Sequence, residues 1–364
     1  MADRELALRG YDAVEFWVGN AKQAAYYYRS AFGCRLVAYA GPETGVRDRA
    51  SYVLQQGNIR IVLTSGLNPD HEVVRHHARR GDAVRDVAFT VDDAEEAFAL
   101  AVERGAAPHH PPEMRSDEHG RVIIAAIAAF GDTIHSFVQR DGYAGVHLPG
   151  FQPVDDDPVA EPVGLIDIDH VVANVEEGRM DRWAAFYERI LAFAPLRHFD
   201  DEDISTEYTA LMSKVLADGD GRIKIPINEP ARGRKRSQIE EFLDAHAGPG
   251  IQHLALTTED IVTTVSRLRD RGVGFLEVPR EYYDDAARRV GEVHEAWEDL
   301  AELGILVDRD DEGYLLQIFT EPVQDRPTVF YEILQRRGAT GFGLGNFRAL
   351  FEAIERAQER RGNL

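Results

Sequence analysis

The sequence contains almost no cysteine. Cys34 is the only one among 364 residues, so an intramolecular disulfide is impossible and a thiolate-rich metal site is excluded. Long apolar runs are also missing, because the longest, Val122 to Phe130, is too short to span a bilayer. The charged first residues lack the apolar core of a secretion signal. We therefore expect a soluble, cytoplasmic protein that has no membrane partner.

Positive charge is also scarce. The chain has 41 Lys and Arg against 63 Asp and Glu, which gives a formal net charge of -22. Such a surface repels a phosphate backbone and an anionic membrane, so nucleic acid is not an expected partner. The length exceeds that of one usual compact domain, and two domains are therefore expected.

The two halves of the chain repeat each other. Residues 12–33 are similar to residues 169–193, and each segment combines a short alternating strand with a helix that carries an aromatic pair. Residues 84–106 are similar to residues 251–273, and in both a strand leads into a helix with an acidic first turn. The expected fold class is α+β, with a strand-helix-strands unit occurring twice in each of two homologous domains.

The segment between the halves is rich in Pro, Gly and Asp, a composition typical of linkers. It places the boundary within residues 145–165. We predict a first domain at residues 1–150 and a second at residues 151–364.

The end of the chain has the pattern of an amphipathic helix. Phe347, Leu350, Phe351 and Ile354 fall on one helical face, after the glycine-rich segment GFGLGNF. A terminal helix that follows such a flexible segment is suited to act as a lid.

The repeats differ at two positions that matter for metal binding. Where the first half has Ala13 the second has His170, and where the first has Asp86 the second has His253. A single histidine on a strand is more often structural than a ligand. The pseudosymmetry of the units, however, brings these two together on facing strands. We therefore predict a metal site in the second domain and none in the first.

A third ligand is expected from the strands that close the last unit. Glu332 lies in the apolar run TVFYEIL, and burial of a bare carboxylate is costly unless a cation or a metal accompanies it. Glu321 is the local alternative, although it precedes Pro322 in a predicted loop, and the residues alone only favour Glu332 over it. Two imidazoles and one carboxylate leave coordination positions open, the pattern of non-haem Fe(II) oxygenases.

The second half also contains seven characteristic segments. They are IDHVVANV, IPINEPA, KRSQIEEFL, GIQHLAL, DRDDEGYLLQIFT, DRPTVFYEI and GFGLGNFRALFEAIE. Over about residues 165–360 they resemble the 4-hydroxyphenylpyruvate dioxygenase family of the vicinal oxygen chelate superfamily, and GNAKQAAYYYRSAFG and ASYVLQQG extend a weaker likeness to the first half. The resemblance implies that two βαβββ modules form an open barrel-like sheet in each domain.

The resemblance also implies a site and a reaction. Fe(II) is expected on His170, His253 and Glu332, where 4-hydroxyphenylpyruvate and dioxygen give homogentisate and carbon dioxide in tyrosine and phenylalanine catabolism. The expected partners are this small molecule, dioxygen and further copies of the chain in a homo-oligomer. The residues expected around the substrate are four amides and two rings: Asn228, Gln238, Gln252, Gln317, Phe319 and Phe347.

One position departs from the family pattern. Thr209 stands where the family has a smaller serine in the strand before the PINEP segment. The hydroxyl group is retained and a methyl group is added, so a slightly tighter pocket is expected.

Three alternatives remain open at this point. A 4-hydroxymandelate synthase shares the substrate and the ligands but hydroxylates the benzylic carbon, and it is expected to carry a smaller aliphatic residue in place of Phe347. A non-catalytic, metal-free binding protein on the same scaffold is the second. An extradiol catechol dioxygenase is the third, but it gives no reason for the PINEP and GFGLGNF segments.

Overall fold

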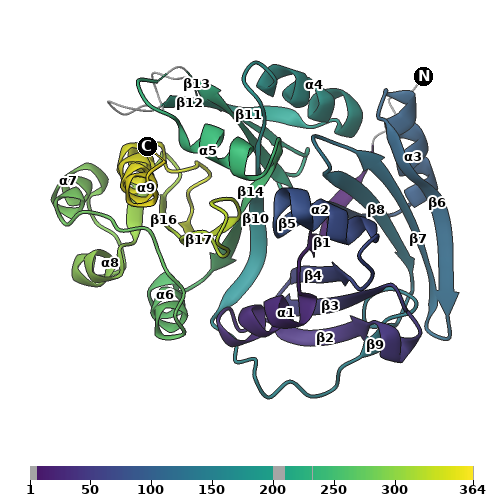
Figure 1. The fold of residues 1–364 in the computed structure, drawn as a ribbon. Coiled ribbons are helices and arrows are strands. Elements are labelled where there is room, and N and C mark those ends of the chain that lie inside the picture. Colours follow the sequence, from purple (N-terminus) through teal and green to yellow (C-terminus); the bar gives the residue numbers. More distant parts are fainter. Residues whose placement is uncertain (1–5, 200–209, 232, 364) are drawn as a thin grey trace.

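The chain forms two curled sheets that lie side by side (Figure 1). The structure is a computed structural model, and it describes residues 6–199, 210–231 and 233–363. Each sheet is built by one half of the chain, as the internal repeat predicts.

The first sheet comes from the N-terminal half. Its strands in the described residues are β1 (Leu8–Trp17), β2 (Arg35–Ala40), β3 (Arg49–Gln56), β4 (Ile59–Gly66), β5 (Ala83–Val91), β6 (Pro108–Asp117), β7 (Gly120–Ala128), β8 (Ile134–Asp141) and β9 (Gln152–Pro153). They lie in the order β6-β7-β8-β5-β1-β4-β3-β2-β9. The central pair, β1 and β5, is antiparallel, whereas β1 with β4 and β5 with β8 are parallel.

The second sheet comes from the C-terminal half. Its strands in the described residues are β10 (Leu165–Asn174), β11 (Ala194–Phe199), β12 (Ala210–Ala217), β13 (Lys224–Ala231), β14 (Gly250–Thr258), β15 (Leu306–Arg309), β16 (Tyr314–Phe319) and β17 (Phe330–Arg337). They lie in the order β11-β12-β13-β10-β14-β17-β16-β15, again with an antiparallel centre, β10 and β14.

Helices connect the strands of both sheets (Figure 1). In the described residues they are α1 (Ala21–Ser30), η1 (Pro42–Thr44), α2 (Glu72–Arg80), α3 (Ala94–Glu103), α4 (Met180–Leu191), α5 (Gln238–Ala245), α6 (Ile261–Asp270), α7 (Glu281–Val290), α8 (Trp297–Leu303), η2 (Leu344–Asn346) and α9 (Phe347–Arg361). The predicted C-terminal helix is confirmed as α9, which lies against α5.

The predicted duplication of βαβββ modules is confirmed. The first half is β1-α1-β2-β3-β4 followed by β5-α3-β6-β7-β8. The second half repeats this order from β10, and again from β14 with α7 and α8 inserted after α6. The acidic helix starts serve as caps in both halves. Asp93 accepts a hydrogen bond from the amide of Glu96 at 2.8 Å, and Asp260 accepts one from the amide of Thr263 at 3.0 Å.

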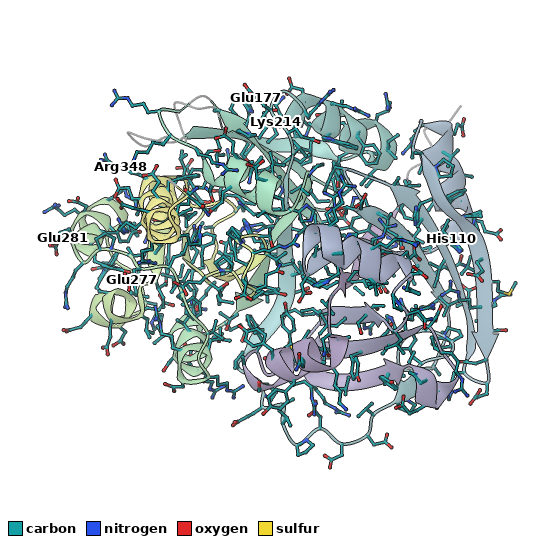
Figure 2. The ribbon with its side chains drawn as sticks, viewed as in Figure 1. His110, Glu177, Lys214, Glu277, Glu281 and Arg348 are labelled. Atoms are coloured by element: carbon teal, nitrogen blue, oxygen red, sulfur yellow. The ribbon has the colours of Figure 1, made fainter. Side chains whose placement is uncertain are left out.

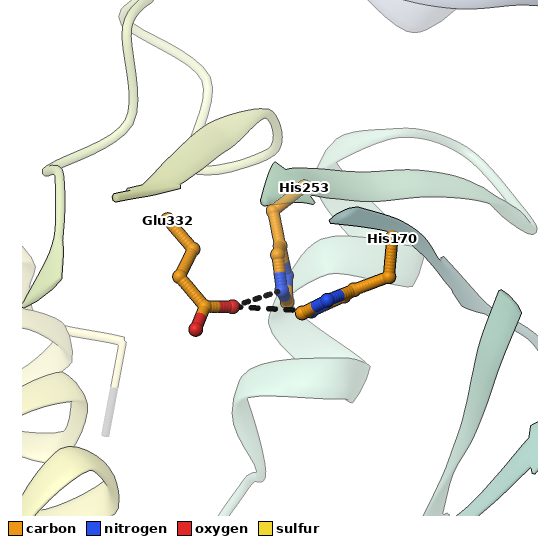
Figure 3. Close-up of side chains that lie close together, drawn as sticks. All are labelled: His170, His253 and Glu332. Atoms are coloured by element: carbon orange, nitrogen blue, oxygen red, sulfur yellow. Dashed lines mark ion pairs between the residues drawn. The ribbon is translucent and has the colours of Figure 1, made fainter. Parts of the chain in front are cut away.

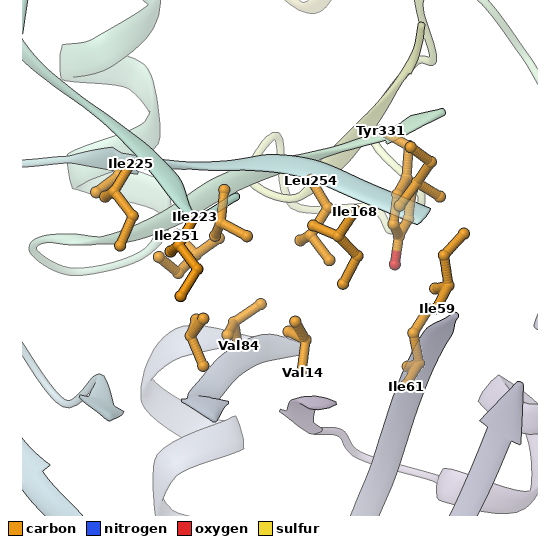
Figure 4. Packing of buried hydrophobic residues seen from close by; sticks show 14 of the residues in the cluster. Val14, Ile59, Ile61, Val84, Ile168, Ile223, Ile225, Ile251, Leu254 and Tyr331 are labelled. Atoms are coloured by element: carbon orange, nitrogen blue, oxygen red, sulfur yellow. The ribbon is translucent and has the colours of Figure 1, made fainter. Parts of the chain in front are cut away.

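An apolar layer joins the two sheets (Figure 4). Side chains of the first sheet, such as Val14 and Ile61, face Ile168, Ile251 and Leu254 of the second. All five are buried, and each large aliphatic side chain buried in this way contributes about 1.5–3 kcal/mol to stability. Because side chains alternate along a strand, the residues between them point to the opposite face of each sheet, and there the cavities lie.

Charged side chains cover the outside of the fold (Figure 2). Glu177, Glu277, Glu281 and Arg348 are exposed examples. Among the helices of the described residues, none combines the length and the apolar character that crossing a membrane requires.

The connection between the halves takes part in the first sheet. β9 lies after residue 150 and pairs with β2 through Ala38 and Pro153. Asp157 follows it and forms an ion pair with Arg29 of α1. The division into residues 1–150 and 151–364 stays a prediction.

Candidate metal centre and ligand cavity

Three neighbouring strands of the second sheet carry the predicted metal ligands. His170 on β10 pairs across the sheet with Ala255 on β14, and Ala255 pairs with Glu332 on β17. His253 lies two residues before Ala255 and therefore on the same face of β14. The register alone thus gathers His170, His253 and Glu332 on one face of the sheet.

The three side chains converge on one carboxylate oxygen (Figure 3). Nε2 of His170 lies 3.1 Å from Oε2 of Glu332, and Nε2 of His253 lies 3.6 Å from the same oxygen. One possible ligand atom from each residue lies within 4.8 Å of the other two, and no second such group occurs among the residues that the structure describes. All three side chains are buried.

The other nitrogen of each imidazole is held by the residue before it. Nδ1 of His170 lies 2.7 Å from Oδ2 of Asp169, and Nδ1 of His253 lies 2.9 Å from Oε1 of Gln252. Both oxygens accept, so each Nδ1 donates and each Nε2 is left as the ligand atom. Histidines that bind metals are oriented in this way by a second hydrogen bond.

An irregularity in β14 allows two adjacent side chains to face the same cavity. Val172 of β10 pairs with His253, but the next residue, Ala173, pairs with Ile251. Gln252 is therefore the extra residue of a bulge. In a regular strand it would point to the opposite face from His253.

The charges of the triad stabilise one another. Burial by itself raises the pKa of Glu332, but the charges and hydrogen bonds of His170 and His253 outweigh it and lower the pKa to about 2. Burial lowers the pKa of His253, and the nearby Glu332 offsets this only in part. The site thus holds a carboxylate that stays ionised beside two imidazoles.

This donor set fits a divalent transition metal. Two imidazole nitrogens and one carboxylate oxygen lie within reach of a common ion, and the ionised Glu332 needs a positive charge in its buried position. The set has the composition of a facial triad, which would leave coordination positions for ligands that are not part of the protein. Glu321, the alternative carboxylate, is exposed and lies 3.6 Å from Arg360, so it does not contribute to this group.

A cavity of about 90 Å³ opens at the triad. All six further residues that the sequence predicted for the substrate line this cavity together with the triad: Asn228, Gln238, Gln252, Gln317, Phe319 and Phe347. Oε1 of Gln317 is buried and has no hydrogen-bond partner in the described part of the chain. The cavity therefore offers polar groups on otherwise apolar walls. The roles of these residues toward a substrate stay predictions.

Several residues that line the cavity were not predicted from the sequence. Ser213 lines the cavity from β12 and pairs with Asn228, whereas Thr209, the predicted departure from the family, lies outside the described residues. Phe330 stacks on the ring of His253 with centroids 4.7 Å apart, and Phe342 lies edge-on to His170 at 5.2 Å. The signal for Phe330 was its position two residues before Glu332, on the same face of β17.

The C-terminal helix closes one side of the cavity. Phe347, Leu350, Phe351 and Ile354, the predicted apolar face of α9, all line it. Gly343 precedes η2 with a φ of +76°, and a Cβ there would lie 2.4 Å from Oε1 of Gln317. Only glycine fits this close approach in a left-handed conformation.

Comparisons with known proteins agree with this geometry. A family model described as hydroxyphenylpyruvate dioxygenase, N-terminal, matches residues 3–156, and a model of the glyoxalase, bleomycin resistance protein and dioxygenase superfamily matches residues 167–318. The 4-hydroxyphenylpyruvate dioxygenase of Dictyostelium discoideum is 48% identical over 98% of this chain and 100% of the relative. That of Yarrowia lipolytica is 47% identical over 98% of this chain and 94% of the relative. The chain belongs to the 4-hydroxyphenylpyruvate dioxygenase family.

A solved structure supports the same family fold. A triple mutant of 4-hydroxymandelate synthase from Streptomyces coelicolor superimposes with a TM-score of 0.87 at 36% identity, covering 96% of this chain and 99% of that one. The predicted membership of the vicinal oxygen chelate superfamily and the two-domain fold are confirmed. The 4-hydroxyphenylpyruvate dioxygenase family is an oxidoreductase family, so the chain is an enzyme and not a metal-free binding protein.

Proposed function

We propose that the enzyme oxidises 4-hydroxyphenylpyruvate with dioxygen to homogentisate and carbon dioxide, with Fe(II) bound by His170, His253 and Glu332. The observation that carries this proposal is the convergence of both Nε2 atoms on Glu332 in the wall of a cavity. The near full-length similarity to 4-hydroxyphenylpyruvate dioxygenases supports the choice of substrate.

Iron is the metal that suits this site best. When bound, Fe(II) supplies open coordination positions and the electrons with which dioxygen is activated. The protein contributes the rest. Asp169 and Gln252 orient the two imidazoles, and Glu332 keeps its negative charge beside them.

The cavity would hold a flat phenol next to the triad. Phe319, Phe330 and Phe347 provide apolar faces for a ring, while amide groups provide hydrogen bonds for its polar end. Gln317 is suited to this task, because its buried Oε1 lacks a partner in the described residues. The apolar walls and α9 exclude water during the oxidation. At about 90 Å³ the cavity is small, so we expect α9 to move when substrate enters.

A 4-hydroxymandelate synthase is the second candidate, since a mutant of such an enzyme shares the fold at a TM-score of 0.87. The phenylalanine at position 347 supports homogentisate formation. The two products are isomers, so the decisive experiment is a chromatographically resolved product analysis with Fe(II), ascorbate and 4-hydroxyphenylpyruvate. Homogentisate is the expected product, and hydroxymandelate alone would refute the proposal.

The cellular setting follows from the proposed reaction. We propose that the enzyme acts in the cytoplasm, in tyrosine and phenylalanine catabolism, and that it forms a homo-oligomer. Light scattering of the purified protein tests the last point, for which a single chain mass would be the contrary result.

A further inference from the structure

A second cavity, of about 310 Å³, lies against the first sheet. This volume falls in the range of small-molecule pockets. The cavity lies on the face of β1 and β5 that corresponds to the face carrying the triad in the second sheet. Ala13 and Asp86, the counterparts of His170 and His253, both line it.

The third ligand also has a counterpart in this cavity. The strand register that places Ala255 beside Glu332 places Ala88 beside Ser136. Alanine, aspartate and serine therefore occupy the positions of the two histidines and the glutamate. Within the part of the chain that the structure describes, no group of three metal-binding side chains occurs here. The first half of the chain thus has a cavity at the equivalent place but lacks the three predicted metal ligands.

Four carboxylate residues line this second cavity, Asp12, Glu15, Glu72 and Asp86, and two of them are paired across the sheet. Glu15 and Asp86 are cross-strand partners, and both line it. Oε1 of Glu15 accepts a hydrogen bond from the hydroxyl of Thr64 at 2.6 Å, and Asp86 accepts one from the amide of Ser136 at 3.0 Å and another from its hydroxyl. Neither carboxylate forms an ion pair with any residue described by the structure. Burial raises the pKa of both groups, that of Asp86 to about 7.

His147 adds an unpartnered polar group to the same cavity. Its side chain is buried, with 5% of the residue exposed, and its Nδ1 has no hydrogen-bond partner in the described residues. Burial lowers the pKa of His147 to about 3, so the ring is neutral. One part of the wall is apolar and is formed by Val62, Ala88, Ile124, Val138, Leu148 and Phe151, while other polar residues, such as Ser51 and His71, line the rest.

We propose that this cavity is a second binding site, specific for a small primary ammonium ion with an apolar body. Its N–H groups would be bound by Glu15 and Asp86, on which Arg85 acts only through its charge, without an ion pair to either carboxylate among the described residues. Its apolar part would lie against the aliphatic wall, and His147 would supply one more hydrogen bond. The hydroxyl groups of Thr64 and Ser136 already hold both carboxylates in place. The loss of side-chain entropy on ligand binding is therefore small.

The arginine side chains that line the cavity do not favour binding of an anion over an ammonium ion. Arg49 and Arg115 lie at its exposed rim, and each has a carboxylate partner of its own, Asp48 and Glu113. The interior is acidic and the ring of His147 is neutral. A divalent metal is disfavoured too, because Ala13 and Ser136 replace two of the three ligands of the other site.

Calorimetric titration of the full-length protein tests the proposal. The ligands are 2-phenylethylamine, hexylamine and cyclohexylmethylamine. Each is compared with the alcohol that has the same carbon skeleton, and phenylacetate serves as the anionic comparison. At least one amine should bind about tenfold more tightly than its alcohol, because a charge-assisted hydrogen bond is lost in the alcohol. Tighter binding of phenylacetate than of any amine would overturn the proposal, as would equal binding of all three amines and their alcohols.

Matched variants locate the site. Asp86→Asn and Glu15→Gln should each weaken amine binding about tenfold, whereas Glu95→Gln, which removes an exposed carboxylate of α3, should not. Both cavity variants should fold, because burial disfavours the charge that they remove, and melting curves verify this. A larger side chain in Ala13→Leu fills the cavity and provides an independent variant. Wild-type amine affinity in all three cavity variants would overturn the assignment. The outcome is independent of the product of the iron site.

Discussion

Asp169 accepts a hydrogen bond from Nδ1 of the adjacent His170 at 2.7 Å. The same carboxylate forms ion pairs with Arg336 at 2.8 Å and with Lys224 at 3.2 Å. Burial by itself raises the pKa of Asp169, but Arg336 and His170 outweigh it and hold the pKa well below its usual range. Asp169 therefore stays charged and fixes the orientation of the ring that we propose as a metal ligand, although it is not itself part of the triad.

The first prediction concerns this orientation. Asp169→Asn should lower the affinity for Fe(II) by about 10–100-fold, the usual effect of losing an orienting partner. Competition with a chelator measures the affinity. Asp12→Asn is the matched control, because Asp12 is the counterpart in the first sheet and pairs with Arg140, far from the triad. Equal affinity in Asp169→Asn and wild type would show that the hydrogen bond does not matter.

The second prediction concerns the ligands themselves. His170→Ala and Glu332→Ala each remove one donor, so Fe(II) binding and turnover should fall together, by more than about 100-fold. Glu321→Ala is the control, since Glu321 is the exposed carboxylate eleven residues earlier. Retained turnover in either ligand variant would refute the proposed triad.

The third prediction concerns the product. Phe347→Val enlarges the cavity beside the triad, so the substrate should be held less firmly and a larger share of hydroxymandelate should form. We expect kcat to fall about tenfold or more, as misplacement of a reacting group usually costs. Leu344→Ala changes an exposed residue of the preceding turn and should leave the product ratio unchanged. An unaltered ratio in Phe347→Val would remove Phe347 as a determinant of specificity.

The fourth prediction concerns pH and stability. The pKa of Asp86 is raised from 3.8 to about 7, because burial and the charge of Glu15 together outweigh the hydrogen bonds of Ser136 and the charge of Arg85. Between these two pKa values the folded protein binds more protons than the unfolded chain. The contribution of Asp86 to the free energy of unfolding therefore falls as the pH rises, and it is lowest above about pH 7.

Asp86→Asn should therefore raise the melting temperature at pH 8 and leave it nearly unchanged at pH 4. A gain of about 1 kcal/mol corresponds to about 1–2 °C for a chain of 364 residues, because the entropy of unfolding grows with chain length. Glu95→Gln, on the exposed face of α3, provides the comparison. A rise of equal size at both pH values would mean that packing, and not the buried charge, is responsible.

Much of the site could be predicted from the sequence, because the chain contains its own comparison. His170 and His253 stand at positions where the other half has Ala13 and Asp86, and the repeat sets both pairs on equivalent strands. The apolar face of α9 was equally visible, since its period of 3.6 residues depends on local geometry alone. The segments that resemble the family indicated the surrounding amides and rings.

The rest depended on strand register, which acts between residues far apart in the chain. Glu332 could only be preferred to Glu321, and its pairing through Ala255 decides which side chain meets the histidines. The bulge that turns Gln252 to the same side as His253 contradicts the alternation that the sequence alone suggests.

The second cavity shows the same division between sequence and structure. The sequence by itself determined that the first half lacks both histidines. Only the tertiary structure decided that Ser136 replaces the glutamate and that Glu15 and Asp86 face an open space together. Parallel pairing of β5 with β8 sets this arrangement, and pairing between distant strands leaves no periodic mark in the chain.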